Sequence, residues 1–429
     1  MPEQSIGHSL PPAFGSTMGL RPWLASKGIT YQFAYVSEVL GNPTGGPQQK
    51  AVYGGRLEAA VDADLEKLTG WKGATARVSG FQLHGQGLTT HYLGNIFPIS
   101  NVEALRGTRL FEAWIEQKLF NDTLSVKFGQ ITADSDFLAG SVSGIFMNAA
   151  FGWPAIAAAD MPSGGLACPL AAPGIRFKYD ATPNQSYLVA VFNGDPAGRG
   201  PAHLNPQLRN PHGLIFPVND PPVVMTEAQF KHSAIGLPGM LKLGWWTHFG
   251  TFDDRRFDGN GVSLADTTLS TGNPRRHRFD HGIYSVVDQQ LWQLPGGQPD
   301  QGISSFFRAS WSPPDRNLID LDIDVGLTFK GLVPRRPDDA FGVAIGFARI
   351  SPAVRAFDID TALFTGVRTP FRDFEAVIEA TYQAQVSPGF TIQPDFQYIF
   401  RPGGNVADST GLRPVRNAAV FGLRAIMRY

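Results

Sequence analysis

The sequence predicts an all-β protein, a 16-stranded antiparallel transmembrane β-barrel with short periplasmic turns and long extracellular loops, one of which is folded into the lumen. Two observations lead to this fold class. Apolar and polar residues alternate with period two in segment after segment, and the connections between these segments alternate between long and short. The 429 residues are 43% hydrophobic and 17% charged, which excludes a charge-rich disordered chain.

The period-two alternation places one set of side chains on each face of a strand. It is strictest in segment 317–329, where apolar residues at odd positions alternate with Asp320, Asp322 and Asp324. No helical period of similar quality occurs in the sequence. The predicted strands are residues 30–40, 55–66, 74–84, 108–119, 124–131, 174–180, 186–193, 223–231, 240–250, 283–292, 303–311, 317–329, 341–350, 372–386, 390–399 and 419–429.

The connections after odd-numbered strands are long, and those after even-numbered strands are short and carry turn residues. The long connections include 85–107, 132–173, 194–222 and 251–282, and the short ones include 121–123, 181–185 and 387–389. A soluble β-sandwich would also alternate, but it rarely places its long loops on one side. A row of aspartates on one strand face needs water, which the lumen of a wide barrel supplies.

Charge and cysteine content limit the partners. The chain has 36 Lys and Arg against 37 Asp and Glu, so it has no basic excess for a nucleic acid. A single cysteine, Cys168, excludes an internal disulfide and a thiolate-rich metal site. No signal peptide is visible in the first thirty residues, so either a leader was removed or left out of the numbering, or the protein stays in the cytoplasm. We expect an N-terminal periplasmic segment at 1–29 and a barrel domain at 30–429.

Several long stretches of the chain form specific motifs. The longest is LGNIFPISNVEALRGTRLFEAWIE at 93–116. The others, in chain order, are PSGGLACPLAAPG (162–174), FNGDP (192–196), LPGMLKLGWW (237–246), VVDQQLW (286–292), TIQPDFQYIFRPGG (391–404) and VFGLRA (420–425). Together they resemble the carbohydrate-selective porin (OprB) family of Gram-negative outer membranes, and the resemblance runs from about residue 30 to residue 429. Cys168 departs from it, because an aromatic residue, most often tyrosine, is expected there.

The resemblance implies a porin of the outer membrane that lets small sugars diffuse passively through a water-filled barrel, with no cofactor and no chemical step. The alternatives are a general porin without sugar preference and a soluble β-rich carbohydrate-binding or hydrolytic protein. We expect small carbohydrates, outer-membrane lipid and lipopolysaccharide as partners, and either a monomer or a homotrimer. The last strand ends on Tyr429, with an aromatic signal that resembles the one read by the barrel assembly machinery, although by spacing alone it could be a core strand.

Connection 132–173 is unusually apolar for an exposed loop, and its uncharged run 137–159 is long enough to span a bilayer. Gly140, Gly144 and Pro154 interrupt this run, which disfavours a transmembrane helix. We expect the loop to fold into the barrel and narrow it, with Trp153 stacking on a sugar ring. A lid packed on other extracellular loops is the alternative.

Strand parity selects polar side chains that face the lumen, where they can set selectivity. For each of them the alternative is a solvated wall residue that touches no solute. Together with Trp153 from connection 132–173, the predicted pore-lining residues are Glu38, Arg56, Arg77, His84, Glu112, Glu116, Arg176, Lys178, Arg308, Asp320, Glu375, Glu379, Asp395 and Arg424. Further lumen candidates are Glu58, Asp62, Lys242, Asp322, Gln397 and Arg428.

Patterns that would indicate an enzyme or a metal site are weak. Glu375 and Glu379 lie about 13 Å apart along one strand face, which is too far for the carboxylate pair of a glycoside hydrolase. The aspartates at 320–324 begin like a calcium loop, but Val325 and Gly331 occupy its glycine and glutamate positions. His277 and His281 could bind a metal if they were helical, whereas the neighbouring arginines favour a polar loop. We therefore expect no enzyme activity, no cofactor and no metal.

Overall fold

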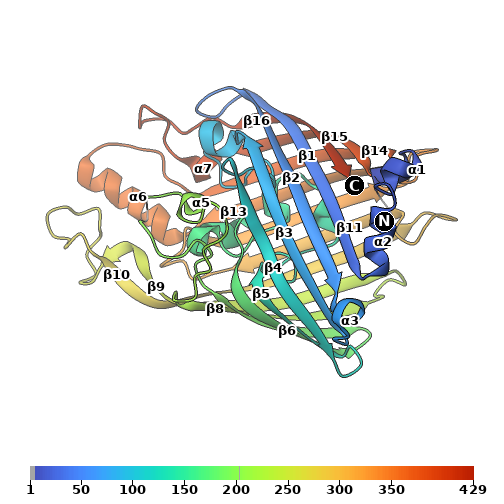
Figure 1. The fold of residues 1–429 in the computed structure, drawn as a ribbon. Coiled ribbons are helices and arrows are strands. Elements are labelled where there is room, and N and C mark those ends of the chain that lie inside the picture. Colours follow the sequence, from blue (N-terminus) through green and yellow to red (C-terminus); the bar gives the residue numbers. More distant parts are fainter. Residues whose placement is uncertain (1–4, 202) are drawn as a thin grey trace.

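Antiparallel strands close into one barrel in the computed structural model, which describes residues 5–201 and 203–429 (Figure 1). Each strand pairs with its sequence neighbours, and β1 pairs with β16 to close the ring. The strands are β1 (Ile29–Thr44), β2 (Ala51–Asp64), β3 (Ala74–Gly85), β4 (Gly107–Leu119), β5 (Leu124–Ile131), β6 (Ala172–Thr182), β7 (Gln185–Asn193), β8 (Pro222–His232), β9 (Gly239–Asp258), β10 (Pro274–Gln293), β11 (Gly302–Trp311), β12 (Ile319–Lys330), β13 (Ala340–Ile350), β14 (Phe374–Ser387), β15 (Phe390–Phe400) and β16 (Ala418–Arg428).

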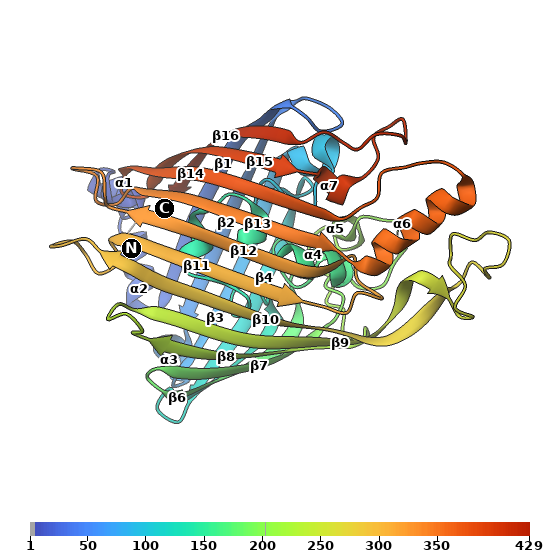
Figure 2. The same ribbon diagram turned by 180° about the vertical axis from the view of Figure 1, so that it is seen from behind.

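The predicted strands are confirmed in number and order, with one notable difference in length. Strands β9 and β10 continue beyond the barrel as a two-stranded hairpin, so the predicted connection 251–282 shrinks to 259–273 (Figure 2). Both faces of this hairpin are polar because it has left the lipid, and the period-two signal fades there. An ion pair of 2.6 Å between Arg276 and Asp253 joins its two strands.

The two ends of the barrel differ. The segments 86–106, 132–171, 194–221, 351–373 and 401–417 connect strands at one end, which we call the loop end, and short turns connect them at the other, the turn end. The helices in the loop-end segments are η2 (Thr89–Leu93), η3 (Val142–Ile145), η4 (Ala149–Phe151), α4 (Ala155–Asp160), η5 (Pro162–Gly164), α5 (Pro206–Arg209), α6 (Pro352–Thr365) and α7 (Pro402–Asn405). Helix α3 (Leu65–Thr69) lies in the β2–β3 turn. Among the described residues, no helix has the length and apolar character needed to cross a membrane.

Helix α6 shows how the local sequence sets these elements. Ser351 caps its start by accepting a hydrogen bond from the Val354 N–H, and Pro352 follows at the first helical position. Gly366 ends the helix in a left-handed conformation with φ of 70°.

Strand parity predicts the two faces of the wall correctly where it is strictest. On β12, Val325 is 42% exposed on the outer face, whereas Asp322 and Asp324 point inward. The inward aspartates are nevertheless buried, with at most 2% exposure. The expectation that lumen water solvates them is wrong, because loop segments fill this part of the lumen. The largest fully buried side chains include Phe97, Phe137 and Phe151, all from loops.

Residues 5–28 precede the barrel and lie at the turn end, close to the C-terminus (Figure 1). They contain η1 (Ile6–His8), α1 (Pro12–Gly15) and α2 (Leu20–Ser26). Residues 1–4 of the predicted segment 1–29 lie outside the described residues, and its periplasmic location stays a prediction.

Replacing Val325 by arginine tests the outer face at mid-strand. A cation in the middle of the lipid-facing wall should lower the free energy of unfolding by about 2–4 kcal/mol. Val333→Arg, in the exposed β12–β13 turn, is the matched control and should change it little. Urea unfolding in lipid vesicles measures both, and equal effects would contradict the assignment of the lipid face.

Candidate functional site

Residues 132–171, here called the in-folded loop, connect β5 and β6 and pack against the inward side of the opposite wall. In Figure 2, α4 of this loop lies inside the barrel beside β12. The carboxylate of Glu379 on β14 accepts hydrogen bonds from the backbone N–H groups of Met147 (2.6 Å) and Asn148 (2.9 Å). A buried backbone donor needs such an acceptor, since water does not reach it.

The same arrangement recurs along the wall, where carboxylates on three other strands receive backbone donors of the in-folded loop. The pairs are Ile156 to Asp322 at 2.9 Å, Ser141 to Asp288 at 2.6 Å, and Leu138 to Glu227 at 3.0 Å. Four strands thus hold the loop through its main chain. These main-chain contacts hold the loop in the lumen in addition to the contacts of its own side chains described below.

Arg308 on β11 binds the carbonyl groups of the same loop. Its guanidinium, with a side chain 4% exposed, donates to the carbonyl oxygens of Gly152 (3.1 Å), Leu138 (3.2 Å) and Ala150. It also forms an ion pair of 2.5 Å with Asp324. This pair gives the buried arginine its counter-charge.

The segment 86–106 is anchored on β14 in a similar way. Glu375 accepts hydrogen bonds from the N–H groups of Ile96 (2.7 Å) and Phe97 (2.8 Å). Arg424 on β16 pairs with Glu38 on β1 at 2.8 Å and also donates to Ser100 of this segment. These two loop segments therefore cover a continuous part of the inner wall.

Several predicted pore-lining residues are accordingly not exposed to the lumen. The in-folded loop and segment 86–106 cover them, and the expectation that they face solution is wrong for Glu38, Arg176, Arg308, Glu375, Glu379, Asp395 and Arg424, all buried. Asp320 is also buried near the loop end, where its carboxylate binds Arg349 at 2.8 Å.

The charged side chains on β2–β4, by contrast, are only partly buried. Arg77 on β3 lies 2.9 Å from Asp62, 3.8 Å from Glu112 and 3.9 Å from Glu58, and the side chain of Asp62 is 40% exposed. The structure thus brings together acids and a base from three adjacent strands on one partly solvated surface.

A second group of charges continues this wall on β4–β6. Arg176 lies 3.0 Å from Glu116 and 3.4 Å from Asp136 of the in-folded loop, and Lys127 lies 2.9 Å from the same Asp136. The two groups together are named the charged wall, with Glu58, Asp62, Arg77, Glu112, Glu116, Lys127, Asp136, Arg176 and Lys178 as members. A cavity of about 440 Å3 opens beside Glu116, Arg176 and Lys178.

Arg56 on β2 adjoins the charged wall but contacts the in-folded loop. Its guanidinium lies 3.9 Å from Glu58 and 3.4 Å from the Sγ atom of Cys168. Burial raises the pKa of the Cys168 thiol to about 11, so the thiol is protonated at neutral pH.

Trp114 is a site residue that the sequence reasoning missed. It stands between Glu112 and Glu116 on β4, and the Lys127 ammonium lies 5.1 Å from its ring centroid. Its buried indole N–H has no hydrogen-bond partner among the described residues. The period-two pattern that selects Glu112 and Glu116 also selects Trp114, so the signal was present.

Trp153 does not offer a free ring to the lumen. It is 9% exposed, packs within the in-folded loop, and donates its indole N–H to the carbonyl of Gly164 at 3.1 Å. Gly165, with φ of 80°, lies so close that a Cβ there would be 2.9 Å from the ring. The expected stacking role is therefore wrong, although the residue borders a loop-end cavity of about 500 Å3.

His84 lies on the outer face of the barrel. Its ring stacks on Tyr35 at 5.8 Å, and its Nε2 atom is 3.1 Å from the Tyr35 hydroxyl. It pairs in register with Gly55, two residues from Tyr53, which is exposed on the outer face. The prediction that His84 lines the pore is wrong. A polar side chain is tolerated on the outer face near the barrel rim, where aromatic residues are common, and here Tyr35 provides both a stacked ring and a hydroxyl partner.

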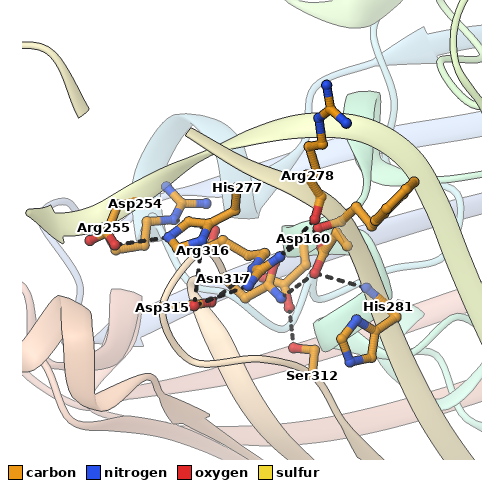
Figure 3. A network of polar contacts seen from close by, with 12 residues as sticks. Asp160, Asp254, Arg255, His277, Arg278, His281, Ser312, Asp315, Arg316 and Asn317 are labelled. Carbon is orange, nitrogen blue, oxygen red and sulfur yellow. Dashed lines mark hydrogen bonds and ion pairs between the residues drawn. The ribbon is translucent and has the colours of Figure 1, made fainter. Parts of the chain in front are cut away.

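A polar network at the loop end attaches the in-folded loop to segment 312–318 (Figure 3). The Asp160 carboxylate accepts hydrogen bonds from the Ser312 hydroxyl (3.1 Å) and the Leu318 N–H (3.0 Å). Burial raises the pKa of Asp160 well above the ordinary aspartate value, the Ile319 N–H lowers it in part, and the nearby Asp280 carboxylate raises it further.

His277, one of the histidines considered for a metal, belongs to the same end of the barrel. Its Nε2 atom lies 2.9 Å from Asp254, and its Nδ1 atom lies 3.7 Å from Asp315 (Figure 3). Within residues 5–201 and 203–429, no group of three or more His, Cys, Asp or Glu side chains could hold a metal ion.

A closed antiparallel barrel with an apolar outer face and loops packed in its lumen defines an outer-membrane channel protein. A family model described as carbohydrate-selective porin, OprB family, matches residues 48–429. The chain therefore belongs to the carbohydrate-selective porin (OprB) family, and it is a porin of the outer membrane.

Individual relatives match nearly the whole chain. Porin B of Pseudomonas aeruginosa is 26% identical over 439 residues, covering 96% of this chain and 89% of that protein. The putative porin QuiX of Acinetobacter baylyi is 23% identical, covering 91% and 88%. The high-pH structure of Pseudomonas putida OprB has a TM-score of 0.85 and 26% identity, covering 97% of each chain.

The raised pKa of Asp160 predicts a pH dependence. The pKa of Asp160 is higher in the folded protein than in the unfolded chain. At pH values between these two pKa values, the folded protein keeps a proton that the unfolded chain has lost. The free energy of unfolding therefore falls as the pH rises through this range. Each pKa unit of difference contributes about 1.4 kcal/mol. Asp160→Asn removes this titration.

The unfolding free energy of the wild type, relative to Asp160→Asn, should therefore decrease from about pH 4, the ordinary aspartate range, upward. Urea unfolding in lipid vesicles across that range measures it. Parallel pH profiles of the two proteins would show that Asp160 ionises as an ordinary carboxyl.

Proposed function

We propose that small uncharged carbohydrates pass along the charged wall, beside Trp114, and that this surface provides the sugar preference. The observation that carries the proposal is the mixture of acids and bases around an aromatic ring on β3–β6. Sugar hydroxyls are both donors and acceptors, and the ring CH face is apolar. Carboxylates, guanidinium groups and an indole match all three features.

The charges of this wall are paired at 2.9–3.9 Å, which limits the field that would draw in ions of one sign. A sugar exchanges its hydrogen bonds with water for hydrogen bonds with the wall, at little net gain. Binding is then weak enough for release, which conduction requires. Passage needs no cofactor and no chemical step.

Membership of the carbohydrate-selective porin family supports this assignment. In our proposal, the in-folded loop forms the constriction and directs solutes to the charged wall. A general porin without sugar preference would share the barrel but would show no selective block by sugars, so the experiments below distinguish the two.

Tyr429 is the residue through which we propose that the barrel assembly machinery recognises the last strand. The support is that Phe421, Leu423 and Met427 on β16 are exposed on the outer face and lead to this terminal aromatic. We also propose contact of the outer wall with lipid and, at the loop end, with lipopolysaccharide. Both a monomer and a homotrimer fit the proposal.

Trp114→Ala tests the sugar path. Loss of one aromatic contact, worth about 0.5–1.5 kcal/mol, weakens binding by about 2- to 10-fold. The sugar concentration that blocks half of the ion current should therefore rise by the same factor. The measurement is current block by glucose and its oligomers in planar bilayers. Trp311→Ala, on the outer face, is the matched control and should leave the block unchanged. Equal behaviour of the two variants would reject the proposed path.

Glu379→Ala tests the role of the in-folded loop. The variant leaves the Met147 and Asn148 N–H groups without their acceptor, at a cost of about 1–3 kcal/mol each. The loop should loosen, so single-channel conductance should rise and become noisier. Asp300→Ala removes one carboxylate from an exposed ion pair with Lys330 and is the control for net charge. A folded Glu379→Ala barrel with the wild-type conductance would show that the loop does not limit the pore.

A further inference from the structure

The N-terminal segment, residues 5–28, exposes an apolar surface that the channel function does not use. Met18 is 84% exposed, Phe14 62% and Trp23 57%, and Leu20 is also exposed. Leu20 and Trp23 are three residues apart in α2 and therefore share one face of the helix. Exposed side chains of this size, close together in the sequence, indicate a contact surface.

Two tyrosines of the barrel hold this segment in place. The Arg21 guanidinium lies 4.5 Å from the ring centroid of Tyr31 and 4.6 Å from that of Tyr429. The hydroxyl of Thr17 lies 2.6 Å from the Tyr31 hydroxyl and 2.7 Å from the Tyr429 hydroxyl. Arg21 is 7% exposed, so these contacts are packed rather than solvated.

Both tyrosines belong to the outer face of the wall. Tyr31 pairs in register with Val61, which is exposed on that face. The main chain of Tyr429 exchanges hydrogen bonds of 2.8 and 2.9 Å with Phe33, another exposed outer-face residue. The segment is therefore clamped against the outside of the barrel at the turn end, and its surface adjoins the lipid-facing wall.

The composition of the segment and its place beside the lipid-facing wall indicate what covers it. Residues 5–28 contain no aspartate or glutamate, and Lys27 is an exposed cation, whereas Arg21 is buried against the two tyrosines. Apolar and aromatic side chains next to a lysine are typical of a segment that lies in a membrane interface.

We propose that the N-terminal segment is an interfacial anchor in the inner-leaflet phospholipid, with Phe14, Met18, Leu20 and Trp23 inserted at the boundary of headgroups and acyl chains. The short turns of such barrels face the periplasm, which places the turn end at that leaflet. By clamping Tyr429, the anchor also covers the closing seam between β1 and β16.

Spin labels on single cysteines test this inference in the full-length barrel. Every variant carries Cys168→Ser, so that the introduced cysteine is the only one in the sequence. Met18→Cys is the test position, and Val61→Cys on the outer face is the reference for lipid. Ser409→Cys, which is exposed at the loop end, is the reference for water. The proteins are reconstituted in vesicles of phosphatidylethanolamine and phosphatidylglycerol. Label accessibility to oxygen, which partitions into lipid, is compared with accessibility to a water-soluble nickel chelate.

The Met18 label should resemble the Val61 label, with a several-fold higher ratio of oxygen to nickel accessibility than the Ser409 label. A ratio equal to that of Ser409 would place the surface in water and overturn the proposal. Shielding from both reagents would overturn it in favour of a protein partner. Trp23→Cys is the second test position, and heat-modified gel mobility confirms that each variant is folded.

Discussion

Hydrogen bonds from loop backbone N–H groups to carboxylates of the barrel wall determine the interior of this porin. A loop inside a barrel carries main-chain donors that water does not reach, and each needs an acceptor. Glu379, Glu375 and Asp322 supply acceptors, and the donors in turn stabilise carboxylates that lie fully or almost fully out of water. Loop and wall therefore satisfy each other, and removal of either group leaves the other buried without a partner.

The solute path that we propose follows from this attachment. Carboxylates on β8, β10, β12 and β14 hold the in-folded loop. Its Asp136 also pairs with Lys127 and Arg176 on β5 and β6, the two strands that the loop connects. Strands β2–β4 keep partly solvated ion pairs, whereas the charges on the opposite wall are buried under loops. The buried lumen charges hold the loops, and Lys127 and Arg176 share this role by binding Asp136. In our proposal, the partly exposed charges are the ones that solutes meet.

The outer surface of the barrel is apolar, because its side chains face lipid rather than water. Near the ends of the strands, tyrosines combine an apolar ring with a polar hydroxyl, and the structure uses them for packing. Tyr35 contacts His84, and Tyr31 together with Tyr429 holds the N-terminal segment. The terminal aromatic residue therefore has a structural role in the folded barrel besides its proposed role in assembly.

The sequence by itself determined the strands, their order and the two faces of the wall, because side-chain direction in a strand follows from local backbone geometry. It also contained the signal for Trp114, which shares the parity of Glu112 and Glu116. It could not show which lumen charges are buried, because that depends on contacts such as Met147 to Glu379, which are 232 residues apart. Only the tertiary structure decided that Trp153 packs inside the in-folded loop, that His84 lies outside, and that Arg308 supports a loop, since each outcome depends on what a distant segment places over the side chain.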